Sequence, residues 1–419
     1  MKSSYETIIV GGGFGGLNAA IQLGKKKRDV LLIDKTNHHL FQPLLYQVAT
    51  AGLSPADIAT PIREILKKYP SITIVMDEVI EMSKESSTVT IKTGHKISFK
   101  NLVLATGARH SYFGNDQWEK LAPGLKSLDD ALSIRENVLR SFEKCELETD
   151  PKKISALTTF VVIGAGPTGV EMAGAIAEIA TKTLAKNFSN IDTKSSKIYL
   201  IEGGERVLSS FHPQLSEKSK KDLESLGVTV KLKSFVKDIT EEGVTVGDDF
   251  IPTKNIVWAA GNKANPILLK LNTHLDRMGR AIVDNDCSIE GFSNIFVIGD
   301  ASAFKRLDGF LPGLAPVAAQ QGKYVANIIK NRLPKGKREA FNYIDKGSMA
   351  TIGKSKAILE LGRIRISGLI AWCAWCLVHL LFLVLFRNRV FIFFDWVYSY
   401  ITEQRGARLI KGRIEKSES

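Results

Sequence analysis

Cysteine is scarce in this sequence. Of its 419 residues only four are cysteines, and they are Cys145, Cys287, Cys373 and Cys376. Four scattered thiols are too few for a disulfide framework, which excludes a small disulfide-stabilised secreted fold and favours a reducing compartment. The composition, 44% hydrophobic and 24% charged, is that of a globular chain long enough for two or three domains with cores of their own.

Runs of residues with charge of one sign are also rare in this sequence. The chain has 57 Lys and Arg against 44 Asp and Glu, a formal net charge of +13, which favours an anionic partner. The basic residues are spread along the chain apart from the run 25–28, and no nucleic-acid-binding motif accompanies them. We therefore expect a membrane surface as partner, no nucleic acid and no metal. Residues 11–16 hold five glycines, which argues against a secretory signal.

A glycine-rich turn lies near the start, in "TIIVGGGFGGLNAAIQLGKK". Gly11, Gly13 and Gly16 fit G-x-G-x-x-G: a tight turn, a close approach to a pyrophosphate, and helix packing on a strand. The helix N-terminus would present N–H groups and a positive dipole end to phosphates. A following strand, "DVLLID", ends at Asp34, where a carboxylate would bind ribose hydroxyls. Glycine at a helix start is weak evidence alone, but the strand before it and the acid after it predict a dinucleotide site.

The same pattern returns in "TFVVIGAGPTGVEMAG", with glycines at Gly164, Gly166 and Gly169. The next strand, "KIYLIEGGERV", ends at Glu202. The spacing is longer than usual, so we expect residues 182–196 to be a helix extension or a loop. An acid at the strand end favours NADH because it would repel the 2′-phosphate of NADPH, although the nearby Arg206 leaves that choice partly open.

Two fingerprints imply two dinucleotides, and the economical pair is a flavin and a nicotinamide that exchange a hydride. Three buried-type strands support this: "NLVLATGARH", "NIVWAAGNKAN" and "NIFVIGDASAF". On these motifs the chain resembles the two-dinucleotide-binding flavoprotein superfamily. The resemblance implies an α/β fold with two nested Rossmann-type domains and a C-terminal helical membrane-anchoring region. The expected divisions are an FAD-binding domain of residues 1–115 and 281–335, an inserted NADH-binding domain of 116–280, and an anchoring region of 336–419.

Cysteine placement separates the members of this superfamily. Disulfide reductases carry a cysteine pair after the second strand, where this chain reads "NHHLFQPLLYQVATAG" and has none. Sulfide:quinone oxidoreductases need cysteines near the flavin, but Cys145 and Cys287 look isolated. Cys373 and Cys376 have redox-motif spacing but lie in an apolar run, where a thiolate is costly, so small hydrophobes are favoured over a redox pair.

Over nearly its full length the chain resembles the type II, non-proton-pumping NADH:quinone oxidoreductases. The most specific stretches are "NHHLFQPLLYQVATAG", "VVIGAGPTGVEMAG", "IFVIGDAS", "PGLAPVAAQQGKYVANII" and "FRNR…EQRGARLI". The resemblance implies a membrane-attached respiratory flavoenzyme with non-covalent FAD, which oxidises NADH and reduces a membrane quinone. Two alternatives stay open: a sulfide:quinone oxidoreductase-like enzyme, and a non-catalytic NADH-binding flavoprotein that senses redox state.

The resemblance also implies site residues. For FAD these are Gly11, Gly12, Gly13, Phe14, Gly15, Asp34, Lys35, His39, Gln42, Val79, Asp300 and Ala318. For NADH they are Gly164, Gly166, Gly169, Glu202 and Gly261.

Two residues are the catalytic candidates. The family links a glutamate at the position of Glu171 to nicotinamide binding or proton transfer, whereas the alternative is an acid that complements a helix dipole. Gln320 matches the second glutamine of the family's A-Q-x-A-x-Q, which lines the quinone site, but Pro316 replaces the first. The alternative for Gln320 is a helix-surface amide, and the adjacent Gln321 should point elsewhere.

A long apolar run occurs once, at residues 369–386. Its roughly 18 residues would make a helix of about 27 Å, at the lower limit for a membrane span. Arg387 and Arg389 follow, and then a second apolar-aromatic segment, which favours a pair of interfacial helices in one leaflet. Basic residues from Arg387 to Lys416 would meet anionic headgroups, and Arg387 would lie where the quinone enters. We expect a monotopic protein on the cytoplasmic side of the cytoplasmic (cell inner) membrane, with a homodimer left open.

Overall fold

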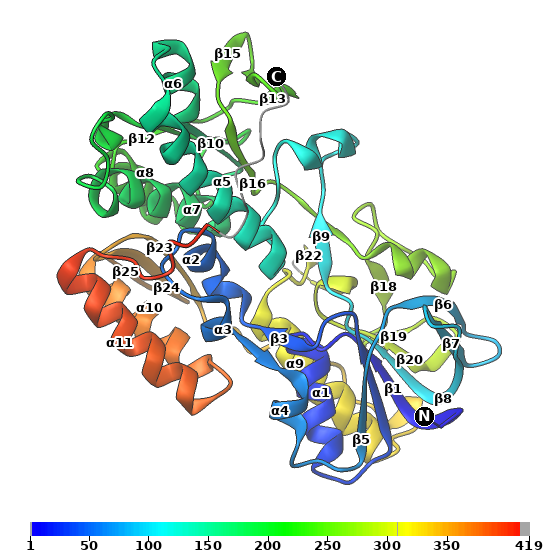
Figure 1. Cartoon of the computed structure of the whole chain (residues 1–419). Coiled ribbons are helices and arrows are strands. Elements are labelled where there is room, and N and C mark those ends of the chain that lie inside the picture. The colour runs from blue at the N-terminus through cyan, green and yellow to red at the C-terminus, as the bar shows by residue number, and fades with distance from the viewer. Residues whose placement is uncertain (1, 308, 411–419) are drawn as a thin grey trace. The chain divides into compact units, whose positions relative to one another are not determined.

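The computed structural model describes residues 2–307 and 309–410 (Figure 1). The chain divides into two compact units, each built from three separate segments. The first unit comprises Met1–Leu40, Ala59–Arg109 and Asn262–Lys346. The second unit comprises Phe41–Ile58, His110–Gly261 and Gly347–Ser419.

The first unit is organised around a sheet of eight strands, whose main path runs β19-β20-β8-β1-β2-β5. Its central pairs are parallel, with Ile8 opposite both Leu31 and Leu102. Both faces of these strands are covered, which is why their sequences are continuous apolar runs. The strands are β1 (Ser4–Val10), β2 (Val30–Asp34), β5 (Ile72–Met76), β6 (Val79–Ser83), β7 (Thr88–Ile91), β8 (Lys96–Leu104), β19 (Ser288–Ile289) and β20 (Phe292–Val297).

Helix α1 (Phe14–Gly24) packs against α9 (Ala315–Lys330) in this unit. Their approach is close, since a Cβ on Gly322 would lie 2.2 Å from the carbonyl oxygen of Gly15. The remaining elements of the first unit are short: β3 (His38–Leu40), β4 (Ala59–Pro61), α4 (Ile62–Leu66), β9 (Ala108–His110), β17 (Asn262–Ala264), η5 (Pro266–Leu271), β18 (Ala281–Val283), η6 (Gly299–Ala301), β21 (Ser302–Arg306), β22 (Gly309–Phe310) and η7 (Lys335–Lys337).

The second unit has its own parallel sheet, in the order β12-β11-β10-β16. Its strands are β10 (Thr159–Ile163), β11 (Lys197–Ile201), β12 (Val228–Lys231) and β16 (Asn255–Trp258), with an antiparallel sheet of β13 (Val236–Thr240), β14 (Gly243–Val246) and β15 (Asp249–Pro252). Its helical segments before residue 347 are η1 (Gln42–Leu44), α2 (Leu45–Ala49), α3 (Pro55–Ile58), η2 (Asp116–Lys120), α5 (Leu128–Leu147), α6 (Pro151–Leu157), α7 (Pro167–Glu178), the π-helix η3 (Ile179–Thr183), η4 (Thr193–Ser195) and α8 (Pro213–Glu224).

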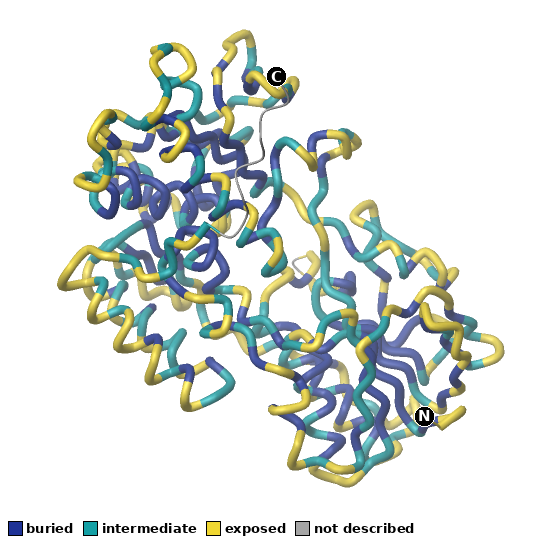
Figure 2. Tube along the Cα trace, viewed as in Figure 1, coloured by how far each residue is buried: buried dark blue, intermediate teal, exposed yellow. Residues whose placement is uncertain are grey.

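A C-terminal part completes the second unit. An antiparallel sheet of β23 (Ser348–Gly353), β24 (Lys356–Leu361) and β25 (Ile364–Ser367) precedes two helices, α10 (Leu369–Phe382) and α11 (Phe386–Thr402). Strand β23 packs on α7, and α10 packs on β24. Within residues 2–307 and 309–410, no helix has the length and apolarity needed to cross a membrane. Most of α10 and α11 is exposed or half-buried (Figure 2).

The predicted strands and the helix pair are confirmed, with one boundary that differs. Residues 369–386 do not form one helix, because α10 ends at Phe382 and α11 begins at Phe386. Arg387 and Arg389 therefore lie in the first turn of α11 and not between two helices. Residues 182–196 hold the end of η3, a loop and η4, as expected. The basic positions beyond residue 410, Lys416 among them, lie outside the described residues.

Candidate functional site

The first glycine turn joins β1 to α1. Gly11 has a φ of +103°, and a Cβ there would lie 2.3 Å from the carbonyl oxygen of Ala105, so only glycine fits. A Cβ on Gly16 would lie 1.8 Å from the carbonyl oxygen of Gly11. Gly13, in contrast, has open space beside it and begins α1 without a side-chain cap from the described residues. The helix N-terminus and the adjoining space are thus available to a pyrophosphate.

The carboxylate of Asp34 is held against this turn. The N–H of Gly12 donates to Oδ2 at 2.5 Å, and the backbone N–H and hydroxyl of Thr36 donate to Oδ1 at 2.7 and 2.8 Å. Each carboxylate oxygen can accept more than one hydrogen bond, so Asp34 keeps capacity for a ribose hydroxyl. The structure therefore brings the predicted acid to the predicted turn.

Asp300 lies where η6, α1 and α9 converge. A Cβ on Gly299 would be 3.0 Å from that of Ala318, and a Cβ on Gly15 would be 3.3 Å from the Ala318 carbonyl oxygen. The N–H of Gly299 donates to Oε1 of Gln321 at 2.7 Å. Within the described part of the chain, the half-exposed Asp300 carboxylate has neither a hydrogen bond nor an ion pair. Its acceptor oxygens are therefore available to a bound group, as a flavin site requires.

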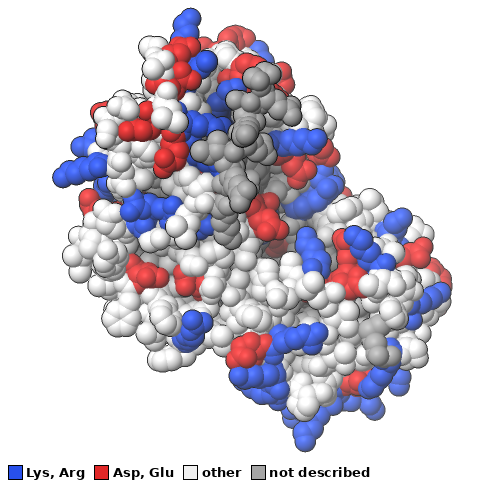
Figure 3. Space-filling view, in the orientation of Figure 1, with Lys and Arg blue, Asp and Glu red and all other residues white. Residues whose placement is uncertain are grey.

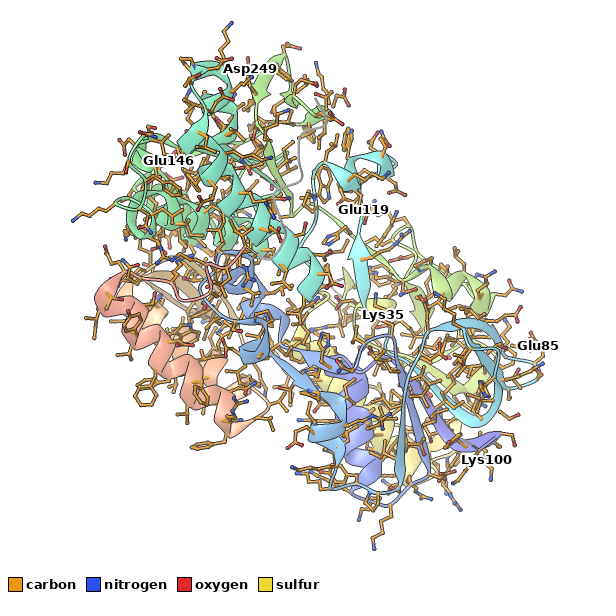
Figure 4. All side chains as sticks on the ribbon, viewed as in Figure 1. Lys35, Glu85, Lys100, Glu119, Glu146 and Asp249 are labelled. Atoms are coloured by element: carbon orange, nitrogen blue, oxygen red, sulfur yellow. The ribbon has the colours of Figure 1, made fainter. Side chains whose placement is uncertain are left out.

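The other predicted FAD residues of the first unit differ in exposure. His39 is buried, its Nδ1–H donates to the carbonyl oxygen of Gly12 at 3.0 Å, and its ring meets the Phe14 ring edge-on at 5.0 Å. Burial lowers the pKa of His39, so the ring is neutral at physiological pH. Val79 is buried at the start of β6, whereas Lys35, labelled in Figure 4, is exposed.

Two predicted glutamines have their amides engaged by backbone. Gln42, in the second unit, donates to the carbonyl oxygen of Lys126 at 3.0 Å. Gln320 donates to the carbonyl oxygen of Ile344 at 2.9 Å and accepts from its N–H at 3.0 Å. This pairing supports the structural alternative for Gln320. Gln321 does point elsewhere, as expected: it is fully buried and bonded to η6.

The second glycine turn repeats the first in the second unit. Gly164 has a φ of +98°, and a Cβ there would lie 2.7 Å from the backbone nitrogen of Ala260. A Cβ on Gly169 would lie 1.8 Å from the carbonyl oxygen of Gly164. Gly166 has open space beside it, and no described side chain caps α7. Gly261, with a φ of +76°, follows β16 in the turn that Gly164 contacts.

Glu202 takes the position that Asp34 has in the first turn. Its Oε2 accepts from the N–H of Ala165 at 2.7 Å, and its Oε1 accepts from the N–H of Gly204 at 2.8 Å. Arg206, the residue that left the nucleotide choice open, donates to the carbonyl oxygen of Ser209 at 2.9 Å. Of these two charged groups, the Glu202 carboxylate is the one with a hydrogen bond from the turn, at Ala165.

A cavity of about 120 Å³ lies entirely within the second unit, beside α7. Its aromatic lining comes from Tyr46, Trp372, Trp375, Trp396 and Tyr400. Its polar lining includes Gln47, Thr50, Glu171, Glu178, Thr351, Lys354 and Arg405. Ring centroids lie 5.4 Å apart for Trp375 and Trp396, and 5.3 Å apart for Trp372 and Tyr400.

Glu171 and Glu178 form the acidic side of this cavity. Burial raises the pKa of Glu171 to about 8, against a smaller opposing effect of a hydrogen bond from the Thr351 backbone. A carboxyl that complements a helix dipole would be ionised, so this raised pKa favours the functional interpretation of Glu171. Glu178 is fully engaged: Oε1 accepts from the N–H of Lys354 at 2.7 Å, and Oε2 from the guanidinium of Arg405 at 3.2 Å.

The two C-terminal helices expose an apolar face. Its large side chains, each more than half exposed, are Leu369, Ile370, Leu377, Leu381, Phe382, Phe386, Phe391, Phe394, Tyr398 and Ile401. The surface over α10 and α11 is mostly uncharged in Figure 3, and aromatic rings project outward from α11 in Figure 4. Arg387 is exposed and lies over the Phe391 ring, 5.0 Å from its centre.

Comparisons with known proteins identify the family of the chain. A family model described as "Pyridine nucleotide-disulphide oxidoreductase" matches residues 5–322, and one described as "NDH2 C-terminal domain" matches residues 346–404. The chain is 40% identical to type II NADH:quinone oxidoreductase Ndh of Mycobacterium tuberculosis, over 96% of this chain and 89% of that protein. It is 39% identical to NdhA of the same organism, over 98% and 90%. The chain belongs to the type II NADH:quinone oxidoreductase family.

Solved structures share the fold of this type II NADH:quinone oxidoreductase. NDH2 from Plasmodium falciparum in complex with NADH superposes with a TM-score of 0.87 at 22% identity, covering 95% of this chain and 98% of that one. The sulfide:quinone oxidoreductase of Aquifex aeolicus gives a TM-score of 0.74 at 17% identity, covering 93% and 92%. At these identities the likeness shows the fold alone, and the curated relatives favour the NADH-oxidising enzyme over the sulfide-oxidising alternative.

Burial keeps three of the four thiols of this type II NADH:quinone oxidoreductase protonated. All four cysteines are free. Burial raises the pKa of Cys376 to about 12 and that of Cys145 to about 11, and it also raises the pKa of the fully buried Cys287. Thiols held protonated are poor nucleophiles, in line with the expectation of small hydrophobes.

Sequence reasoning missed the cavity and most of its lining. Tyr46, Glu178, Trp375 and Arg405 lie far apart in the chain and carry no shared motif. Two of them lie in stretches that marked the family resemblance, "NHHLFQPLLYQVATAG" and "EQRGARLI". Those two stretches were the sequence signal for the cavity, but they did not show where in the fold the cavity lies.

Proposed function

We propose that this chain passes electrons from NADH, through non-covalently bound FAD, to a membrane quinone while attached to one leaflet of the bilayer. The overall reaction follows from the family: the chain is a type II NADH:quinone oxidoreductase, with FAD as cofactor and NADH as substrate. The observation that carries the assignment of sites is the pair of glycine turns. Each has open space at an uncapped helix N-terminus and an acid bonded to the turn.

FAD fits the first turn. The free carboxylate of Asp300 would bind the ribityl chain, Asp34 and Lys35 the adenosine ribose, and the neutral His39 would support the turn through Gly12. Val79, Ala318 and Gln42 remain proposed neighbours of the cofactor. Bound FAD supplies the redox chemistry, accepting a hydride from NADH and releasing two electrons.

NADH fits the second turn, where Glu202 would repel a 2′-phosphate. We propose the corresponding domain division as well. Residues 1–115 and 281–335 would form the FAD-binding domain, residues 116–280 the inserted NADH-binding domain, and residues 336–419 the anchoring region.

Quinone reduction consumes two electrons and two protons, and Glu171 is suited to supply one of the protons. With a pKa of about 8, its carboxyl is neutral at physiological pH and can donate a proton to a reduced quinone oxygen. It then regains a proton from solvent. Gln320 and Arg387 stay proposed contacts of the quinone and its tail, although the Gln320 amide must first leave Ile344.

The apolar face of α10 and α11 would provide the membrane attachment, on the cytoplasmic side. Each large side chain that becomes fully buried in the bilayer contributes about 1.5–3 kcal/mol, so several of them anchor a protein without a span. A homodimer remains compatible with this arrangement.

A pair of charge substitutions tests the anchor. Phe386→Glu with Phe394→Glu, at side chains 77% and 63% exposed, should release the protein from anionic lipid vesicles in co-sedimentation. NADH oxidation by ferricyanide should persist, while turnover with a long-tailed quinone should fall at least about tenfold because its tail enters from lipid. The matched control, Leu147→Glu with Leu269→Glu, changes side chains 85% and 68% exposed and should remain bound. Vesicle binding by the first variant would contradict the proposed anchor.

A further inference from the structure

The indole N–H of Trp375 has no hydrogen-bond acceptor among residues 2–307 and 309–410. The side chain is 2% exposed and lines the cavity beside α7. Buried donors in folded proteins nearly always have an acceptor, because leaving one unpaired costs its full desolvation. The unpaired N–H therefore calls for a partner that the chain itself does not supply.

The side chain cannot easily turn toward another acceptor, because its neighbours hold it. The His379 ring stacks on it, with centroids 4.1 Å apart, and Nδ1 of His379 donates to the Trp375 carbonyl oxygen at 2.7 Å. Trp396 packs on it at 5.4 Å. The Trp396 N–H, unlike that of Trp375, is paired, since it donates to Oε1 of Gln47 at 2.8 Å. Of these two indole donors, the Trp375 N–H is therefore the one that remains available to a molecule bound in the cavity.

The cavity restricts what that partner can be. Its aromatic lining favours a planar ring, and its volume of about 120 Å³ is on the scale of one six-membered ring, since cavities of roughly 150 Å³ hold benzene. Among the other polar groups of the lining, Glu171 can also donate, because its carboxyl is protonated at neutral pH. A ligand that meets two donors must bring two acceptor oxygens. A quinone ring has this chemistry.

We propose that Trp375 determines how the quinone headgroup binds, by donating a hydrogen bond from Nε1–H to one of its carbonyl oxygens. This inference rests on the proposed function and adds a specificity-determining residue to it.

The test replaces Trp375 by Phe, which keeps an aromatic ring and removes the N–H. Trp372→Phe is the matched control: Trp372 lies on the same helix and lines the same cavity, but its indole nitrogen is not among the buried unpaired atoms. With a short-chain quinone, Trp375→Phe should raise KM about 3- to 10-fold with little change in kcat. Trp372→Phe should raise KM less than about twofold, and ferricyanide reduction should be unchanged in both.

Thermal unfolding gives a second readout, independent of turnover. Without quinone, Trp375→Phe should lower Tm, because the smaller ring loses packing against His379 and Trp396, so each variant is compared with and without quinone. Saturating short-chain quinone should raise Tm less in Trp375→Phe than in the wild type and in Trp372→Phe. Should Trp375→Phe not fold, the benzothienyl analogue of tryptophan at position 375, with sulfur in place of N–H, serves the same comparison.

Equal KM values and Tm shifts for the two variants would overturn the inference, since the N–H would then be satisfied by water or by the protein. Failure of the wild type to reduce any quinone, with ferricyanide reduction intact, would instead overturn the proposed function itself.

Discussion

The two glycine turns are built alike but are covered differently. In each, the third glycine of the fingerprint would place a Cβ 1.8 Å from the carbonyl oxygen of the first, and an acid accepts from the backbone N–H of the residue between the first two. Helix α1 is covered by α9, through the contact of Gly322 with Gly15. Helix α7 is covered by β23, where a Cβ on Gly174 would lie 1.8 Å from the Ile352 carbonyl oxygen.

The side chains at equivalent helix positions show what this difference produces. Asn18 and Glu171 each lie two residues beyond the third glycine. Asn18 donates to the Phe14 carbonyl oxygen of its own helix at 2.8 Å, whereas Glu171 lines the cavity with the C-terminal segment. The same glycine-turn design is therefore covered in two ways: the first turn is closed by a helix of its own unit, and the second lies beside the C-terminal region that we propose meets the membrane.

The largest effects are expected from adding a methyl group at Gly322 or Gly174, where α1 and α7 are most closely covered. Gly322→Ala and Gly174→Ala each place a methyl group against backbone, and each should destabilise its unit by about 1–3 kcal/mol or more. Gly322→Ala should lose FAD, whereas Gly174→Ala should keep FAD and lose quinone turnover. Flavin-to-protein ratio and quinone rates distinguish them. Gly336→Ala and Gly406→Ala, which have open space beside them, are the controls.

Asp300 tests whether the first turn holds FAD. Asp300→Ala removes a carboxylate without a partner in the described chain, so FAD should bind about 10- to 150-fold more weakly, the range for a hydrogen bond to a charged group. The protein should purify with little flavin while keeping its far-ultraviolet circular dichroism. Full flavin occupancy at normal affinity would assign the carboxylate another role.

The pH dependence of quinone reduction tests the role of Glu171 at the second turn. Its carboxyl is neutral below its pKa of about 8 and charged above it, so quinone reduction should fall about tenfold between pH 7 and 9. Because the folded-state pKa is raised above the unfolded value of 4.5, the wild type loses stability as pH rises toward 8. Glu171→Gln should remove both trends. A wild-type rate that is flat over this range would exclude the proton-donor role.

Glu202 and Asp34 should differ in their effect on the preference for NADH over NADPH. Glu202→Gln should narrow the preference for NADH over NADPH several-fold, because the amide no longer repels a 2′-phosphate. Asp34→Asn, the same substitution at the first turn, should leave that preference unchanged. Values of kcat/KM for both nucleotides decide the matter, and comparable wild-type values would contradict the role of Glu202.

The strands, both turns and both acids could be predicted because their signals are local. A buried strand followed by G-x-G-x-x-G and a later acid leaves few conformations, and Asp34 and Glu202 lie where their strands end, as predicted. Gln320 shows the limit of such patterns, because its spacing matches a motif while its amide pairs with Ile344, 24 residues away.

The position of the break between α10 and α11 could not be predicted, since residues 382–386 contain neither glycine nor proline. It depends on later contacts: Arg389 donates from Nε and Nη2 to the Leu383 carbonyl oxygen at 2.9 and 2.8 Å. Asn388 donates to the Asp57 carbonyl oxygen at 2.9 Å, a partner 331 residues away in sequence. Hydropathy along the chain holds no information about such partners.

The pairing of Arg405 with Glu178 has a consequence for how the molecule is made. Arg405 also donates to the Thr50 carbonyl oxygen at 2.7 Å, so it joins two cavity walls that are synthesised much earlier. At roughly 5–20 residues per second, Thr50 leaves the ribosome about 20 to 70 seconds before Arg405. By the end of that interval both glycine turns have been synthesised, while the cavity still lacks Arg405. The proposed quinone site is thus completed only after the residues of the proposed FAD and NADH sites have been synthesised.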